Sequence, residues 1–408
     1  MTDQTPADTA QLKARAEAEI ETRRAQLIEL SHAIHADPEL SWDEHRAVAR
    51  IADVLADAGF AVEVGAYGIP TAFEAVYGTG ELTVTLCAEY DALPGVGHAC
   101  GHNVIAAAGV GAALALAPVA DAAGLRVKLL GTPAEEHGGG KVSLLEAGAW
   151  EDSHFSMMVH GFTGVDFAAD AFRSTAVDRF EVEFSGLTAH AAAAPERGIN
   201  AGAAATLALT AIALFRQHMG PDVNINAFVS HGGEATNIIP DRTVVQAEVR
   251  AQDLDVWRRT KARVLSCFEG AAIATGCKWS WRSTEHPYAP VVSDPDLARL
   301  WDANMPARGR TPSSERCLGG GSTDMGNVTQ VVPGIHPMIA FLGQEAVPHN
   351  PDFTAAAATP AADDAAIDGG LLLAWTALDA ALDPTLRADL IRRRAERPVG
   401  GTRATITL

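Results

Sequence analysis

The sequence predicts an α/β protein with a doubly wound, mixed sheet and an inserted ferredoxin-like α+β domain. The chain has 408 residues, more than one ordinary hydrophobic core needs. Apolar strand-like segments alternate with helical segments before about residue 175 and after about residue 286, as in a doubly wound sheet. Between them the order is strand, helix, strand, strand, helix, strand, which is typical of a ferredoxin-like module. We therefore expect a main domain in two parts, 1–175 and 286–408, around an inserted domain at 176–285.

The first part of the main domain begins with a long amphipathic helix. Apolar residues recur at helical spacing from about Thr9 to Ala36, and Pro38 ends the pattern. Ser41 to Glu44 resembles a capping box, which predicts a second helix ending near Gly59. We expect strands at 61–64, 71–77, 82–87, 126–131 and 156–159, and helices at 104–114 and 141–147.

The inserted domain begins where the hydrophobic pattern changes. Residues 177–185 alternate apolar and polar side chains, as an antiparallel strand does. The elements that follow are a helix at 198–219, strands at 223–231 and 242–251, a helix at 254–275 and a strand at 277–282. The main domain then resumes with a helix at 294–304, a strand at 335–342 and an Ala-rich helix at 360–382. The basic run Arg392 to Arg394 is typical of a solvated helix end.

Composition excludes several classes of partner. The net charge of -20 argues against nucleic acid and anionic membranes, because both attract a basic surface. No segment reads as an uninterrupted transmembrane helix, and the N-terminus lacks the features of a signal peptide. The five cysteines are odd in number and scattered, which favours reduced thiols. These observations predict a cytoplasmic protein.

Polar residues that can bind metal follow successive strands of the main domain. Cys100 and His102 lie after the strand at 82–87, Glu136 after the strand at 126–131, and His160 after the strand at 156–159. His349 follows the strand at 335–342. Imidazole, thiolate and carboxylate groups suit zinc, and strand ends of one sheet bring them together. Five protein ligands exceed the needs of one tetrahedral ion, so we expect two divalent ions that share a ligand.

Glu135 has a different predicted role. Adjacent carboxylates in an irregular loop point in different directions, so Glu136 can bind metal while Glu135 reaches a metal-bound water. Such a water is acidic enough for a carboxylate to take its proton and pass it to a leaving amine. This arrangement predicts amide hydrolysis.

Each of these residues also has an ordinary structural explanation. A single His or Cys at a strand end is more often packed than ligating, and paired glutamates in a Gly-rich loop are often solvated. Their joint occurrence favours the metal site. Cys87, Cys267 and Cys277 are interpreted as small apolar fillers, while Glu89 and His98 receive no role.

At these residues the sequence resembles a dinuclear metallopeptidase and aminoacylase family that includes carboxypeptidase G, aminoacylase and the plant auxin-conjugate hydrolases. Cys100-Gly101-His102 is similar to the ligand motif of the last branch. The resemblance implies that Cys100, His102, Glu136, His160 and His349 are metal ligands, that Glu135 is the base, and that Asp91 orients a ligand. We expect the two ions to be zinc, with Mn, Co or Ni as alternatives.

Three further motifs resemble one subgroup of that family, which includes p-aminobenzoyl-glutamate hydrolase and β-alanyl-lysine dipeptidase. They are Asn103 after the ligand histidine, the segment from Gly319 to Asp324, and the segment from Ala189 to Pro195. The resemblance implies that the main domain is catalytic and that the inserted domain is a lid and dimerisation module. It implies substrate contacts from His190, donated across a homodimer, and from Asn237 and Arg250.

These observations predict a metal-dependent amidohydrolase that cleaves a small N-acyl-amino acid, an aminobenzoyl-amino acid or a dipeptide. One alternative is a non-catalytic dimeric binding or scaffold protein that retains the fold. A second is a zinc deaminase, which the absence of the His-x-Glu and Pro-Cys-x-x-Cys motifs disfavours. The acyl group and the amino acid depend on loop shape and stay open.

Overall fold

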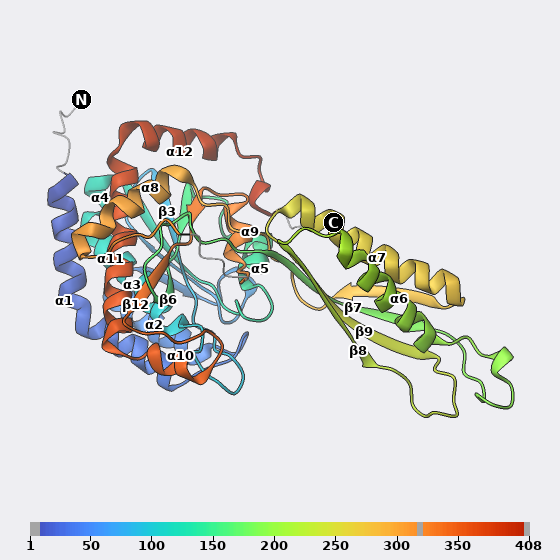
Figure 1. The fold of residues 1–408 in the computed structure, drawn as a ribbon. Coiled ribbons are helices and arrows are strands. Elements are labelled where there is room, and N and C mark those ends of the chain that lie inside the picture. Colours follow the sequence, from blue (N-terminus) through green and yellow to red (C-terminus); the bar gives the residue numbers. More distant parts are fainter. Residues whose placement is uncertain (1–8, 316–320, 404–408) are drawn as a thin grey trace. The chain divides into compact units, whose positions relative to one another are not determined.

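The structure is a computed structural model that describes residues 9–315 and 321–403. It divides into two compact units (Figure 1). The described residues up to Arg173 and from Val291 onward form the first unit, and Ser174–Pro290 form the second. Cys317 and the first two glycines of the segment from Gly319 to Asp324 lie outside the described residues.

A mixed six-stranded sheet forms the centre of the first unit. Its strand order is β1-β2-β4-β3-β5-β11, in which β3 runs parallel to β4 and β5, and β2 runs antiparallel to β4. Every residue of β3 is buried, as expected for a strand covered on both faces. The strands are β1 (Ala61–Val64), β2 (Phe73–Tyr77), β3 (Leu82–Ala88), β4 (Leu125–Gly131), β5 (Phe155–Met157) and β11 (Gly334–Ile335).

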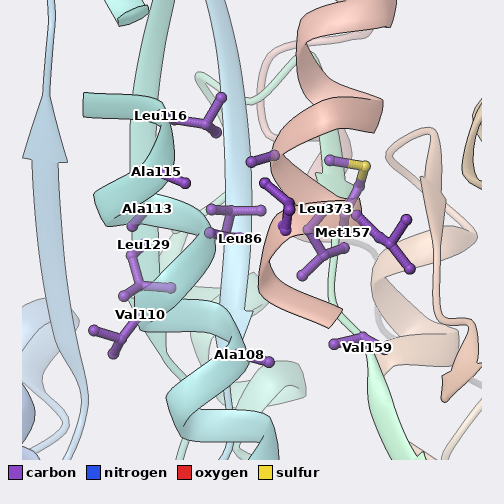
Figure 2. Packing of buried hydrophobic residues seen from close by; sticks show 14 of the residues in the cluster. Leu86, Ala108, Val110, Ala113, Ala115, Leu116, Leu129, Met157, Val159 and Leu373 are labelled. Atoms are coloured by element: carbon purple, nitrogen blue, oxygen red, sulfur yellow. The ribbon is translucent and has the colours of Figure 1, made fainter. Parts of the chain in front are cut away.

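Three long helices pack on one another. They are α1 (Thr9–Ala36), α3 (His102–Leu116) and α11 (Pro360–Leu382), and α3 among them lies directly on this sheet. All residues of α3 are buried, and Figure 2 shows apolar side chains of α3, β3 and α11 gathered in this core, among them Ala113, Leu86 and Leu373. The remaining helices of this unit are α2 (His45–Asp57), α4 (Ala120–Ala123), α5 (Gly140–Ala147), α8 (Pro295–Asn304), α9 (Met325–Thr329), α10 (Pro351–Ala356) and α12 (Pro384–Glu396).

Two helical stretches are long and apolar enough to cross a membrane by length and composition, contrary to the expectation from the sequence. They are His102–Ala123 and Pro360–Leu382. In both, 89% of the apolar window is buried inside the protein. Core helices pass the same test, so this is weak evidence of membrane spans.

The second unit has the ferredoxin-like topology that the sequence predicts. Its antiparallel sheet has the order β10-β7-β9-β8, and α6 (Ala201–Phe215) and α7 (Leu254–Thr275) pack on each other and on β9. Phe180, Phe184 and Phe268 are fully buried at the centre of its core. The strands are β7 (Ala176–Ser185), β8 (Val223–His231), β9 (Arg242–Ala251) and β10 (Lys278–Ser283).

Two strand predictions were wrong around a two-stranded parallel sheet. The strand expected to stop at His160 already ends at Met157. A separate strand, β6 (His160–Gly164), begins at His160. The strand expected at 335–342 is split, because His336 and Pro337 separate β11 from β12 (Met338–Leu342). Proline has no N–H to donate to a strand ladder, which accounts for a break at this point. β12 pairs with β6 and thereby supports His160.

The basic run near the C-terminus lies at the end of α12, as predicted, but only Arg392 is exposed there. Arg393 lies in α12 and pairs with the buried Asp294 at 2.8 Å, where Asp294 is the N-cap of α8. Arg394 donates to the carbonyl oxygen of Asp152 at 3.1 Å. These contacts tie α12 to the first unit.

The close packing of α11 on α3 predicts a large effect at Gly370. A Cβ atom at this position would lie 2.8 Å from the carbonyl oxygen of Ala108, which is backbone and yields little. We expect Gly370→Ala to lower the free energy of unfolding by about 1–3 kcal/mol, measured by denaturant titration. Gly270→Ala is the matched control, because nothing lies within 4 Å of its Cβ position in α7. The control should be stabilised by about 0.5–1 kcal/mol, and an equal response of both variants would contradict the packing account.

Candidate metal centre

The candidate ligands lie in the segments after β3 and β4, at the start of β6 and in the loop after β12, all in the first unit. Cys100 and His102 flank Gly101, whose φ of 78° is in the left-handed region that favours glycine. This turn places the thiol just before α3 and the imidazole on its first residue. Glu136 follows β4, and the backbone N–H of His349 donates to the carbonyl oxygen of Ala99 at 2.9 Å. Sequence segments far apart thus meet at one place.

The structure brings the five predicted ligands together as two groups that share Cys100. One group is Cys100, His102 and His160, and the other is Cys100, Glu136 and His349. Within each group, one potential ligand atom per residue lies within 4.8 Å of the others. The Cys100 Sγ and His160 Nε2 atoms are 3.5 Å apart, and His349 Nε2 lies 3.7 Å from Glu136 Oε2. The shared residue is therefore the thiol.

The orphaned atoms at this place fit a divalent cation. His102 Nε2, Glu136 Oε1 and Glu89 Oε2 are buried and find no hydrogen-bond partner within the described parts of the chain. Buried polar atoms without a partner cost roughly 1–3 kcal/mol each, so such atoms call for a ligand. Thiolate, imidazole and carboxylate are the donor types that zinc and similar ions accept.

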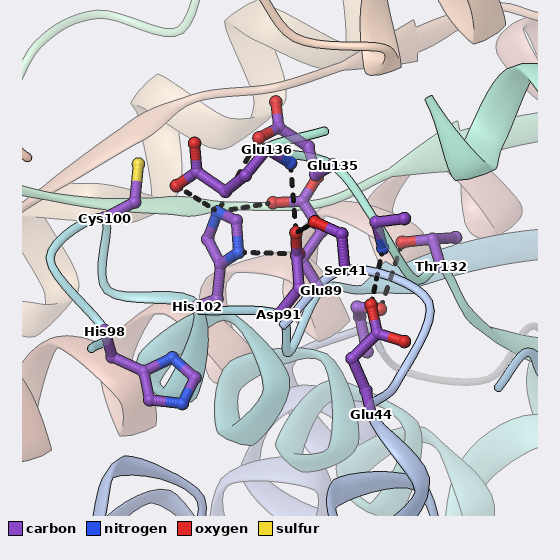
Figure 3. A network of polar contacts seen from close by, with 12 residues as sticks. Ser41, Glu44, Glu89, Asp91, His98, Cys100, His102, Thr132, Glu135 and Glu136 are labelled. Atoms are coloured by element: carbon purple, nitrogen blue, oxygen red, sulfur yellow. Dashed lines mark hydrogen bonds and ion pairs between the residues drawn. The ribbon is translucent and has the colours of Figure 1, made fainter. Parts of the chain in front are cut away.

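Asp91 fixes which nitrogen His102 presents. The His102 Nδ1 and Asp91 Oδ1 atoms are 3.0 Å apart, and the other Asp91 oxygen accepts from Ser41 and from the backbone N–H of Glu136 (Figure 3). Burial raises the pKa of Asp91, but the charge and hydrogen bond of His102 outweigh it and hold the pKa at about 2. An ionised Asp91 accepts a hydrogen bond from Nδ1–H, which leaves Nε2 as the nitrogen of His102 that can bind a metal ion.

His160 is oriented in the same way by the backbone. Its Nδ1 lies 2.7 Å from the carbonyl oxygen of Gly161, which can only accept. Its Nε2 atom therefore faces Cys100 with a lone pair. Both histidines of this group present the nitrogen that a metal ion binds.

Glu135 lies beside the ligands, where a proton acceptor can act. Its Oε2 atom is 3.8 Å from His102 Nε2, and the side chain is almost fully buried. Burial and the neighbouring carboxylates of Glu89 and Glu136 raise the pKa of Glu135 well above its ordinary value. Burial is also the main cause that raises the pKa of Glu136 to about 7. A bound cation would counter both effects.

The backbone beside these carboxylates is held in an unusual conformation. Ala134 has a φ of 57°, which is rare for a residue with a side chain, and its N–H donates to Glu44 Oε1 at 2.8 Å. Glu44 also accepts from the N–H of Trp42 at 3.0 Å. The capping box predicted at Ser41 to Glu44 is therefore wrong, because Ser41 binds Asp91 and Glu44 serves as a backbone anchor for the loop of Glu135. His349 is likewise left-handed, with a φ of 66°.

Sequence reasoning missed a buried charge cluster next to the ligands. Lys141 pairs with both Glu89 and Asp324, and all three side chains are inaccessible to solvent. His336 was missed as well; it is buried 5.6 Å from the ring of His160, measured between ring centroids. The position of Glu89 at a strand end was the one available signal.

The three predicted substrate residues all lie in the second unit. His190 is exposed and pairs with Ile238, next to Asn237, whose carbonyl oxygen accepts from the N–H of Ala191 at 2.9 Å. Arg250 lies near the other end of β9 and contacts Glu248 at 2.7 Å. The structure thus brings His190 and Asn237 together, and it does not bring Arg250 to them within one chain.

Comparison with known proteins places this geometry in a family. Residues 83–363 match the model of Peptidase family M20/M25/M40. Xaa-Arg dipeptidase of Mus musculus is 38% identical over 92% of this chain and 90% of its own length. One of the subunits of p-aminobenzoyl-glutamate hydrolase from Escherichia coli is 29% identical over 63% of this chain and 57% of its own length.

A solved structure agrees on the fold. The dinuclear metal binding peptidase of the M20 family from Bacillus subtilis superposes with a TM-score of 0.69 at 19% identity. The match covers 88% of this chain and 99% of that one. The α/β fold with its inserted unit is therefore confirmed. The chain belongs to peptidase family M20/M25/M40 and is a metal-dependent hydrolase of amide or peptide bonds.

Proposed function

We propose that this protein is a two-metal amidohydrolase acting on a small N-acyl-amino acid, aminobenzoyl-amino acid or dipeptide. The observation that carries the proposal is the pair of ligand groups that share Cys100, with Glu135 beside them. Relatives named as a dipeptidase and as an aminobenzoyl-glutamate hydrolase support this range of substrates. A non-catalytic binding protein is disfavoured, because both the ligand set and the base are complete.

The residues of the first unit would divide the chemistry as follows. Two bound divalent ions would polarise the scissile carbonyl and make a water easier to deprotonate. Glu135 accepts the proton of the attacking water and returns it to the nitrogen of the leaving amine. Asp91 keeps His102 in the required tautomer, and Glu44 holds the backbone that carries Glu135.

We propose zinc as the native metal, because a thiolate with several imidazoles is a donor set that zinc prefers. Mn, Co and Ni are alternatives for reconstitution.

We further propose that the first unit is the catalytic domain and that the protein is cytoplasmic. We also propose that nucleic acid and membranes are not its partners, which the net charge of -20 supports.

The second unit is proposed to act as a lid and to form a homodimer. Its edge strand β8 exposes Phe228 and Val229, and its α6 exposes Leu214, which leaves an apolar surface suited to a second copy. The separation of His190 and Asn237 from Arg250 is compatible with substrate contacts that come from two subunits. Arg250 suits a substrate carboxylate, because its guanidinium can bind both oxygens.

The role of Glu135 predicts a specific loss of turnover. Glu135→Gln keeps the size of the side chain but removes the proton acceptor, so kcat should fall by roughly 10²–10⁴-fold. Metal content by elemental analysis should stay unchanged. Glu146→Gln on the exposed side of α5 is the control and should retain full activity. An active Glu135→Gln variant would rule out this mechanism.

The shared position of Cys100 predicts that its loss affects both ions. Cys100→Ser should bind markedly less metal after dialysis than the wild type, because each group loses a ligand. Cys267→Ser, at a half-buried position in the second unit, should bind metal normally. Retention of two ions by Cys100→Ser would remove Cys100 from the ligand set.

The proposed donation of His190 across a dimer can be tested by complementation. His190→Ala and Glu135→Gln should each be inactive alone. Mixed dimers should regain activity, because one of their two sites would combine an intact Glu135 with an intact His190 from the other subunit. No recovery despite subunit exchange confirmed by mass spectrometry would show that His190 does not act across the dimer.

A further inference from the structure

Glu89 occupies the position between the predicted ligands and the buried charge cluster. It directly follows β3, two residues before Asp91, and its side chain is inaccessible to solvent. No role follows for it from sequence. Its two carboxylate oxygens have different surroundings, and this difference suggests what it does. Figure 3 shows Glu89 beside His102.

One oxygen of Glu89 is anchored. Oε1 accepts from the ammonium group of Lys141, at the start of α5. The same ammonium donates to Asp324 Oδ1 at 2.7 Å, and the backbone N–H of Lys141 donates to Asp324 Oδ2 at 2.8 Å. Glu89 is therefore held by the buried ammonium group of Lys141. Rotation of the Glu89 carboxylate would break this contact.

The other oxygen of Glu89 faces the His102 ring. Oε2 lies 3.5 Å from His102 Nε2, and neither atom has a hydrogen-bond partner among the described residues. Because Nδ1 of His102 is engaged by Asp91, Nε2 is the nitrogen that can present a lone pair toward this oxygen. A carboxylate oxygen and an imidazole nitrogen that face each other in a buried site need a cation between them, either a metal ion or a proton on Nε2. Their separation is close to that of two ligands on a tetrahedral ion with bonds of about 2.0–2.2 Å.

We propose that Glu89 is a sixth protein ligand, which binds through Oε2 the ion held by His102, while Lys141 anchors its other oxygen. This inference rests on the proposed metal centre. It gives that ion a negatively charged ligand besides the shared thiol. It also gives Lys141 a function, since its ammonium group keeps the carboxylate aimed at His102.

Two substitutions test whether Glu89 binds the ion directly or only contributes negative charge near it. Glu89→Gln places an amide where Oε2 was, so its NH₂ group can donate to His102 Nε2 and compete with the metal. Asp324→Asn removes a charge from the other side of the same Lys141 and leaves Glu89 intact. With zinc as the probe, dialysis and elemental analysis should give two ions per wild-type chain, two for Asp324→Asn and one for Glu89→Gln. Titration should show the second ion at least about tenfold weaker in Glu89→Gln.

The outcomes are distinguishable. Two ions of unchanged affinity in Glu89→Gln, or equal losses in both variants, would overturn the assignment of Glu89 as a ligand. A wild type that binds no ion would instead contradict the proposed function. If Glu89→Gln does not fold, as judged by circular dichroism, a zinc-soaked wild-type crystal decides. Oε2 should then lie about 2.0–2.2 Å from the ion beside His102, and a distance beyond direct coordination would reject the inference.

Discussion

Mutual repulsion among buried carboxylates is the constraint on which the candidate site depends. Glu89 and Asp91 follow β3, Glu135 follows β4 and Asp324 precedes α9, and all four side chains are buried. Lys141 is buried as well and pairs with Glu89 and Asp324. Burial raises the pKa of Asp324 to about 6, and it also raises the pKa of Glu135 well above its ordinary value. Divalent cations in the two groups around Cys100 would supply the missing positive charge. Metal binding would therefore stabilise this buried arrangement of carboxylates.

The apolar core of the first unit makes this arrangement possible. α3 is buried along its whole length between the sheet, α1 and α11, so His102 is fixed at its first turn. The left-handed Ala134 and His349 are positions where the backbone accepts strain next to functional groups. Asp91, Glu44 and Lys141 then orient side chains and loops by hydrogen bonds. The stability of the apolar core thus offsets the free energy that burial of these polar groups costs.

Local patterns predicted the elements of this fold better than their contacts. α1 and α11 begin and end where helical periodicity, Pro38 and Pro360 place their limits, and β8 and β9 match their alternating patterns. The strand-end rule also found the residues that the structure brings together around Cys100. It could not find Lys141 with Glu89 and Asp324, which are 52 and 183 positions away, because such pairs depend on tertiary packing. The break at His336 and Pro337 was missed because a continuous apolar run hides it.

The central claim is that two ions share the thiolate of Cys100. Anomalous diffraction from crystals of the metal-loaded wild type, recorded at the absorption edge of the bound metal, tests it most directly. The account predicts two peaks, each about 2.3 Å from Cys100 Sγ if the ions are zinc, with His102 and His160 on one side and Glu136 and His349 on the other. A single peak, or two peaks of which neither contacts Cys100, would contradict it.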